Sequence, residues 1–68
     1  MNGQEVGKSF NRMERGEHLS DAELKYLRDG LQMLVSFFLE TKAFPLHGYY
    51  VMQLYVVNSY LENRKVNP

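Results

Sequence analysis

The chain has 68 residues, enough for one small domain, with eight basic and eight acidic side chains and a formal net charge of zero. It contains no cysteine, which excludes a disulfide framework and a thiolate zinc site. Hydrophobic residues make up 44% of the sequence, which argues against a disordered chain, and the neutral charge gives no general attraction to nucleic acid or to an anionic membrane.

Residues 1–18 are polar, and we expect them to form an N-terminal arm that is either mobile or folded into a short helical turn. Glycines are spread through this segment and lower its helix propensity. In a helix, this segment would carry two stripes at helical spacing. The apolar stripe is Val6, Phe10 and Met13, and the basic stripe is Lys8, Arg12 and Arg15. We expect the arm to order only on docking, with Phe10 as its apolar anchor and with Arg12 and Arg15 pairing with acidic groups of a partner or ligand. Deletion of residues 1–16 should then leave the fold intact.

The segment 20–42 has the clearest helical pattern in the chain. Ser20 and Glu23 have the spacing of a capping box, in which each side chain accepts a hydrogen bond from the backbone of the other residue. Leu19 and Leu24 fall at the two positions of a hydrophobic staple. Apolar residues then recur on one helix face: Leu24, Leu27, Leu31, Leu34 and Phe38.

A second helix is predicted over residues 46–65. Pro45 disfavours the α conformation of Phe44, so the first helix ends before it, and the second begins either at Pro45 or after Gly48. The richness in tyrosine and valine also fits a buried strand, but the uninterrupted length favours a helix. One face of this helix is apolar: Tyr50, Leu54, Val57 and Leu61.

Both predicted helices carry a second apolar face, which is more than a single hairpin can bury. Gly30 lies on this face of the first helix, where a glycine permits close approach of another helix. We expect two hairpins to meet across a twofold axis, because chains this short rarely hold a stable core alone. The expected oligomer or partner interface comprises Tyr26, Gly30, Met33, Phe37, Met52, Val56 and Tyr60.

The sequence therefore predicts an all-α protein. Residues 1–18 form the arm, and residues 19–68 form a two-helix antiparallel hairpin that associates as a homodimeric four-helix bundle or a higher oligomer. No stretch has the apolar length of a signal peptide or a membrane span, so a cytoplasmic location is expected.

No residue pattern points to catalysis, a metal site or a cofactor. The two histidines lack cysteine or carboxylate neighbours at ligand spacing, and no serine has an adjacent base. A helix-turn-helix role in DNA binding is an alternative, but neutral charge and an apolar second helix weigh against it. A small anion or nucleotide could instead bind at the start of the second helix and at an oligomer seam, through Lys8, Arg12, His47, Tyr49 and Tyr50.

These considerations leave protein–protein interaction as the predicted function. Aromatic residues, methionine and arginine are enriched in protein interfaces, and this chain places tyrosine, phenylalanine and methionine on helix faces that its hairpin cannot bury. Its short, neutral format resembles the small accessory and inhibitor proteins that bacteriophages and mobile elements encode. We expect a non-catalytic regulator or inhibitor that binds itself and another protein, with ligand sequestration and DNA binding as the alternatives.

Overall fold

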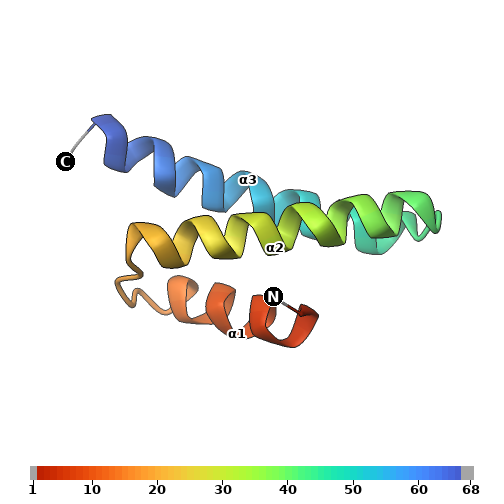
Figure 1. The fold of residues 1–68 in the computed structure, drawn as a ribbon, viewed down its shortest axis with the longest axis horizontal. Coiled ribbons are helices and arrows are strands. Elements are labelled where there is room, and N and C mark those ends of the chain that lie inside the picture. Colours follow the sequence, from red (N-terminus) through yellow and green to blue (C-terminus); the bar gives the residue numbers. More distant parts are fainter. Residues whose placement is uncertain (1, 67–68) are drawn as a thin grey trace.

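The computed structural model describes residues 2–66, which form three helices (Figure 1). These are α1 (Gly3–Glu14), α2 (Asp21–Glu40) and α3 (Phe44–Val66). α2 lies between the other two helices and packs against both, and α1 and α3 each run antiparallel to it. The predicted all-α fold is confirmed. Residues 67 and 68, which the predicted hairpin domain included, lie outside the described residues.

α1 replaces the arm that we expected at the N-terminus. The Asn2 side chain caps it by accepting a hydrogen bond of 2.9 Å from the backbone N–H of Glu5, and Gly16 follows its end with a left-handed φ of 85°. Its apolar stripe is buried against the other two helices: Val6, Phe10 and Met13. A helix this short is marginal in isolation, so its stability comes from docking. A helix of 12 residues thus lies where the sequence predicted a mobile or short-helical arm.

α2 begins directly after the predicted cap Ser20 and ends at Glu40, two residues before the predicted end. Ser20 accepts from the backbone N–H of Glu23, and the Glu23 carboxylate accepts from the backbone N–H of Ser20, each at 3.1 Å, so the capping box is confirmed. Leu19 and Leu24 are both buried beside it. The helix ends with Lys42 in the left-handed region at a φ of 61°. The N–H of Ala43 donates to the carbonyl of Phe38 at 2.9 Å, as in a Schellman motif.

α3 begins two residues before the predicted start. Phe44 is its first residue and Pro45 lies in its first turn. Proline is tolerated there because the first N–H groups of a helix have no intrahelical acceptor. The backbone N–H of His47 already donates to the carbonyl of Ala43 at 2.9 Å.

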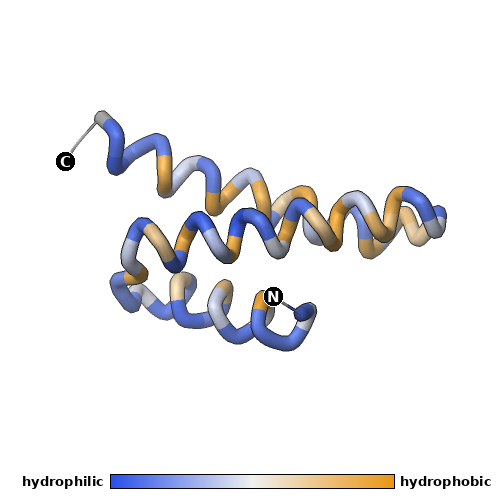
Figure 2. Tube along the Cα trace, in the orientation of Figure 1, coloured by the Kyte–Doolittle hydropathy of each residue, from blue (hydrophilic) through white to orange (hydrophobic). Residues whose placement is uncertain are grey.

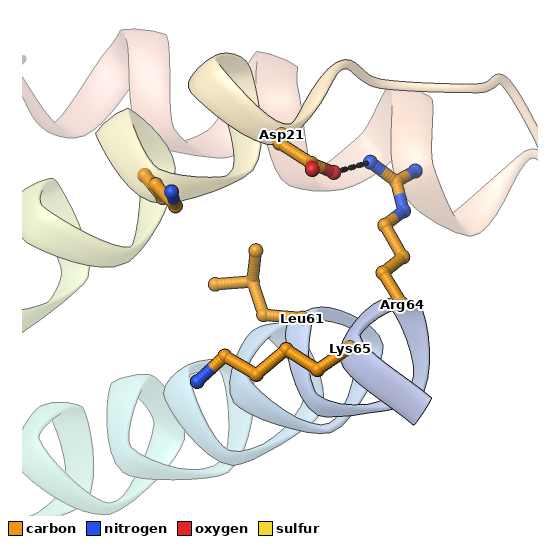
Figure 3. A pocket seen from close by; sticks show the side chains of 5 residues that line it. Asp21, Leu61, Arg64 and Lys65 are labelled. Atoms are coloured by element: carbon orange, nitrogen blue, oxygen red, sulfur yellow. Dashed lines mark hydrogen bonds and ion pairs between the residues drawn. The ribbon is translucent and has the colours of Figure 1, made fainter. Parts of the chain in front are cut away.

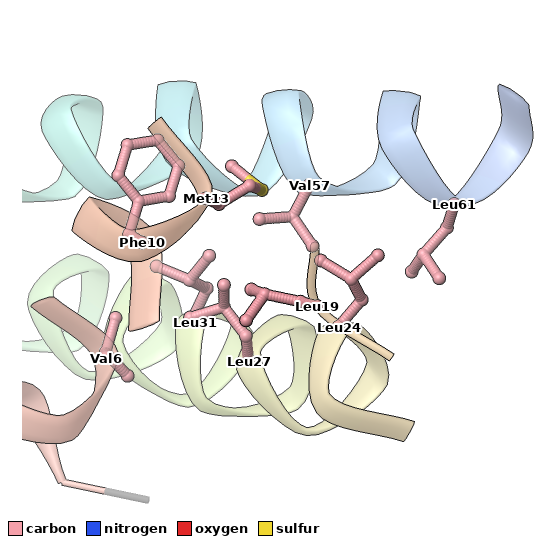
Figure 4. Packing of buried hydrophobic residues seen from close by; sticks show 9 residues of the cluster. All are labelled: Val6, Phe10, Met13, Leu19, Leu24, Leu27, Leu31, Val57 and Leu61. Atoms are coloured by element: carbon pink, nitrogen blue, oxygen red, sulfur yellow. The ribbon is translucent and has the colours of Figure 1, made fainter. Parts of the chain in front are cut away.

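The core gathers side chains from all three helices and from the α1–α2 loop (Figure 4). Its buried members are Val6, Phe10, Met13, Leu19, Leu24, Leu27, Leu31, Val57 and Leu61. The predicted leucine face of α2 and the predicted inner face of α3 are confirmed, because the remaining members of both faces pack against this cluster or are half-buried. The core is therefore concentrated in the half of the hairpin beside α1.

Candidate functional site

About half of the α2–α3 hairpin has no third helix beside it. α1 has 12 residues and α2 has 20, so at 1.5 Å per residue α1 is about 18 Å long and α2 about 30 Å. α1 lies along the part of α2 next to their connecting loop (Figure 1). Apolar residues are frequent where α2 ends and α3 begins (Figure 2). The exposed large hydrophobic side chains are Tyr26, Met33, Phe37, Leu39, Phe44, Leu46, Tyr49, Val51, Met52, Tyr55 and Tyr60.

Four aromatic rings lie where the second half of α2 meets the first half of α3. The Phe38 and Tyr50 rings stack with their centroids 5.6 Å apart. Phe37 packs edge-on against Phe38, and Tyr49 packs edge-on against Tyr50, with centroid distances of 5.3 and 5.1 Å. Aromatic pairs of this geometry stabilise a helix contact by more than the burial of their apolar surface alone would. The inner rings therefore hold the two helices together, while Phe37 and Tyr49 remain exposed.

An open groove of about 320 Å³ lies between α1 and α3. One wall comes from α1 and the other from α3, and the lining residues are Phe10, Glu14, Tyr49, Met52, Gln53 and Val56. α2 packs closely against both helices, whereas α1 and α3 have far less contact with each other. The two helices therefore flank an open surface groove that α2 does not fill.

Gln53 is the one buried polar side chain among the residues that the structure describes. Its residue surface is only 7% exposed, and its Oε1 atom accepts no hydrogen bond from residues 2–66. Buried side-chain acceptors in proteins nearly always have a partner. This carboxamide was not among the predicted site residues, because sequence alone did not show which face of α3 would meet α1.

α3 also has an apolar stripe on the side that faces away from α2. Phe44, Val51 and Tyr55 recur at helical spacing and are 58%, 40% and 74% exposed. The stripe lies across the helix from the buried side chain of Val57. No charged residue occurs in α3 before Glu62, so the first half of this helix is apolar on nearly every side. Sequence analysis missed this stripe, although its spacing of seven and four residues is a visible signal.

The predicted interface residues have three different placements. Gly30 is buried within the chain and does not lie on an open surface of the protomer. Val56 is half-buried in the groove wall. The other predicted members are exposed, namely Tyr26, Met33, Phe37, Met52 and Tyr60. On the α3 side, these residues border α1, since Tyr60 lines a small hollow with Met13. The neighbour expected from a second chain is thus partly supplied by α1.

The basic residues predicted to contact a partner are engaged within the chain. Arg12 pairs with Glu17 at 3.2 Å and with Glu23 at 3.3 Å, and Arg15 pairs with Glu17 at 2.8 Å. Hydrogen bonds from Arg15, and then from Arg12, hold the pKa of the Glu17 carboxyl below its ordinary value. Phe10, the predicted anchor, is a core residue. Phe10 thus packs within the chain's own core, and contacts of Arg12 and Arg15 with a partner stay a prediction.

The five residues predicted to bind a small anion are not assembled into one site. Arg12 lies in the last turn of α1 and pairs with Glu23 at the start of α2. His47 lies in the first turn of α3, at the opposite end of the hairpin (Figure 1). Lys8 is exposed on α1, while Tyr49 and Tyr50 belong to the aromatic contact between α2 and α3.

A hollow of about 190 Å³ lies where α3 approaches the start of α2. Arg64 reaches across it and donates a hydrogen bond of 2.8 Å to the Asp21 carboxylate (Figure 3). This hydrogen bond lowers the pKa of the Asp21 carboxyl. The ion pair of Arg64 with Asp21 therefore connects α3 to the start of α2, while Lys25 and Lys65 also line the hollow.

No protein-family model, curated protein or solved structure matches the chain. Within residues 2–66, no helix is long and apolar enough to cross a membrane. The same residues contain no cluster of three or more histidine, aspartate or glutamate side chains that could hold a metal ion.

Proposed function

We propose that this protein is a small protein-binding module, acting as an accessory regulator or inhibitor through contact with another protein and without chemistry of its own. The observation that carries the proposal is the outward stripe of α3, formed by Phe44, Val51 and Tyr55. Its exposed side chains are large and apolar, and a helix that is apolar on nearly all sides is typically enclosed by other protein. Large apolar side chains exposed along one helix face are typical of interaction sites in soluble proteins.

The stripe suits a partner that presents an apolar helix face or groove. Phe44, Val51 and Tyr55 span about three turns of α3, a length comparable with the anchors of helix-in-groove contacts. Tyrosine supplies a large apolar ring and one hydrogen-bonding group at low entropic cost. The absence of charge before Glu62 means that apolar complementarity, and not ion pairing, determines the choice of partner.

Site-specific photocrosslinking in the source cells tests this function. A photoreactive phenylalanine analogue is placed at Tyr55 in one variant and at Tyr26 in another, because both tyrosines are exposed and lie on different helices. We expect position 55 to yield one discrete adduct with a second protein, position 26 to lack it, and Val51→Ser in the same chain to reduce it at least tenfold. The proposal fails if both positions give the same adducts, or if position 55 crosslinks only to copies of this chain.

A further inference from the structure

Gln53 presents a buried hydrogen-bonding group that the chain itself does not satisfy. Its Oε1 has no donor within the described part of the chain, and leaving such a buried group without a partner costs about 1–3 kcal/mol. Gln53 also lines the groove between α1 and α3. Because Oε1 itself is buried, the carboxamide must turn about its last torsion before a donor in the groove reaches the oxygen and removes this cost.

We propose that the occupant is α3 of a second copy of this chain, packed antiparallel to the first α3 about a twofold axis beside Gln53. Met52, which is 70% exposed on the same wall of the groove, enters the groove of the other copy. The two Gln53 carboxamides meet at the axis, and each N–H donates to the oxygen of the other. A carboxamide can pair with a second carboxamide because it has both hydrogen-bond donors and an acceptor. Rotation about the last torsion of the Gln53 side chain turns its oxygen toward the groove.

The charges around the groove favour a copy of the same chain over a charged partner. A twofold axis brings each residue close to its own counterpart, so like charges near the axis would repel. The α3 wall of the groove is uncharged, with Tyr49, Met52, Gln53 and Val56. Glu14 is the only charged residue in the lining, and it belongs to the α1 wall. The two Glu14 carboxylates therefore lie on opposite edges of the dimer, away from the axis.

The spacing along α3 fits helix–helix packing. Tyr49, Met52 and Val56 follow each other at three and four residues and form one ridge on the groove side of the helix. A single polar pair inside an apolar helix contact fixes the register of the two helices, as buried asparagine does in coiled coils. Gln53 has this role in the proposed dimer. The inference is independent of the proposed function, because the stripe of Phe44, Val51 and Tyr55 lies on the side of α3 opposite Gln53.

Sedimentation equilibrium at micromolar concentration tests the dimer with a matched pair of variants. Gln53→Glu places two carboxylates at the axis, whereas Gln32→Glu adds the same charge at an exposed position of α2. We expect the wild type and Gln32→Glu to be dimers, and Gln53→Glu to have a dissociation constant at least tenfold higher. A monomeric wild type, or equal association of both variants, overturns the proposal.

Cysteine crosslinking provides a second test that does not depend on the folding of Gln53→Glu. The natural chain has no cysteine, so Met52→Cys and Val51→Cys each introduce the only thiol. Under mild oxidation, Met52→Cys should form a covalent dimer, and Val51→Cys, on the outward stripe, should stay monomeric on a non-reducing gel, because adjacent helix positions do not face the same neighbour. The reverse pattern would make the outward stripe the self-interface and would overturn both this inference and the proposed function. Equal crosslinking of both variants, or none, overturns the dimer alone.

Discussion

Replacing Phe10 by alanine tests whether α1 belongs to the cooperative core. Phe10 is 7% exposed and packs among the buried side chains that all three helices contribute. Truncating a buried phenylalanine costs about 3–5 kcal/mol, and the lower value of about 3 kcal/mol applies here because water from the adjoining groove can enter the vacated space. In a domain of this size, that loss lowers Tm by roughly 12–24 °C. Asn11→Ala, at the exposed neighbouring position, should leave Tm nearly unchanged.

Thermal and urea unfolding followed by circular dichroism measure this difference. The chain concentration must be the same for both variants, because Phe10 also lines the groove in which we place a second copy. A Tm change below about 4 °C for Phe10→Ala, corresponding to less than about 1 kcal/mol, would refute the packing of α1. The same reasoning reverses the expectation that deletion of residues 1–16 leaves the fold intact. Deletion removes three of the nine buried core side chains, so the truncated chain should lose cooperative unfolding.

The two helix ends and the Asp21 ion pair give further predictions. Lys42→Gly should raise stability by about 1 kcal/mol because Lys42 has a left-handed φ of 61° that glycine adopts without strain. Gly16→Ala should lower stability by a similar amount, because Gly16 has a left-handed φ of 85°. Urea midpoints of Lys42→Gly and Gly16→Ala that shift in the same direction would contradict these two predictions. The bond from Arg64 lowers the pKa of the Asp21 carboxyl from its ordinary value of 3.8, so its contribution to stability is present above that pH and is lost as pH falls through the folded pKa. Arg64→Met should therefore make Tm fall less steeply between roughly pH 5 and pH 2, and parallel wild-type and variant curves would show that the pair does not stabilise the fold.

The start and the inner face of α2 could be predicted because the signals that set them are local. The Ser20–Glu23 capping box and the leucines that follow it act through neighbouring backbone groups and one helix face. The inner face of α3 was predictable for the same reason, since Val57 and Leu61 follow one helical period. The start of α3 was not fixed by the sequence. Proline occurs both in the first turn of helices and just before them, so Pro45 does not show on which side of it the helix begins.

The role of α1 was decided only by tertiary contacts. Its stripe of Val6, Phe10 and Met13 was visible in the sequence, but Gly3 and Gly7 lower its helix propensity, and a segment this short is not a stable helix on its own. Its helix forms because α2 and α3 present an apolar surface on which it can dock. That docking also determines which face of α3 borders a groove, why Gln53 is buried there, and which apolar side chains remain open to a partner. These properties depend on the distance between segments far apart in the chain, which no local pattern of residues specifies.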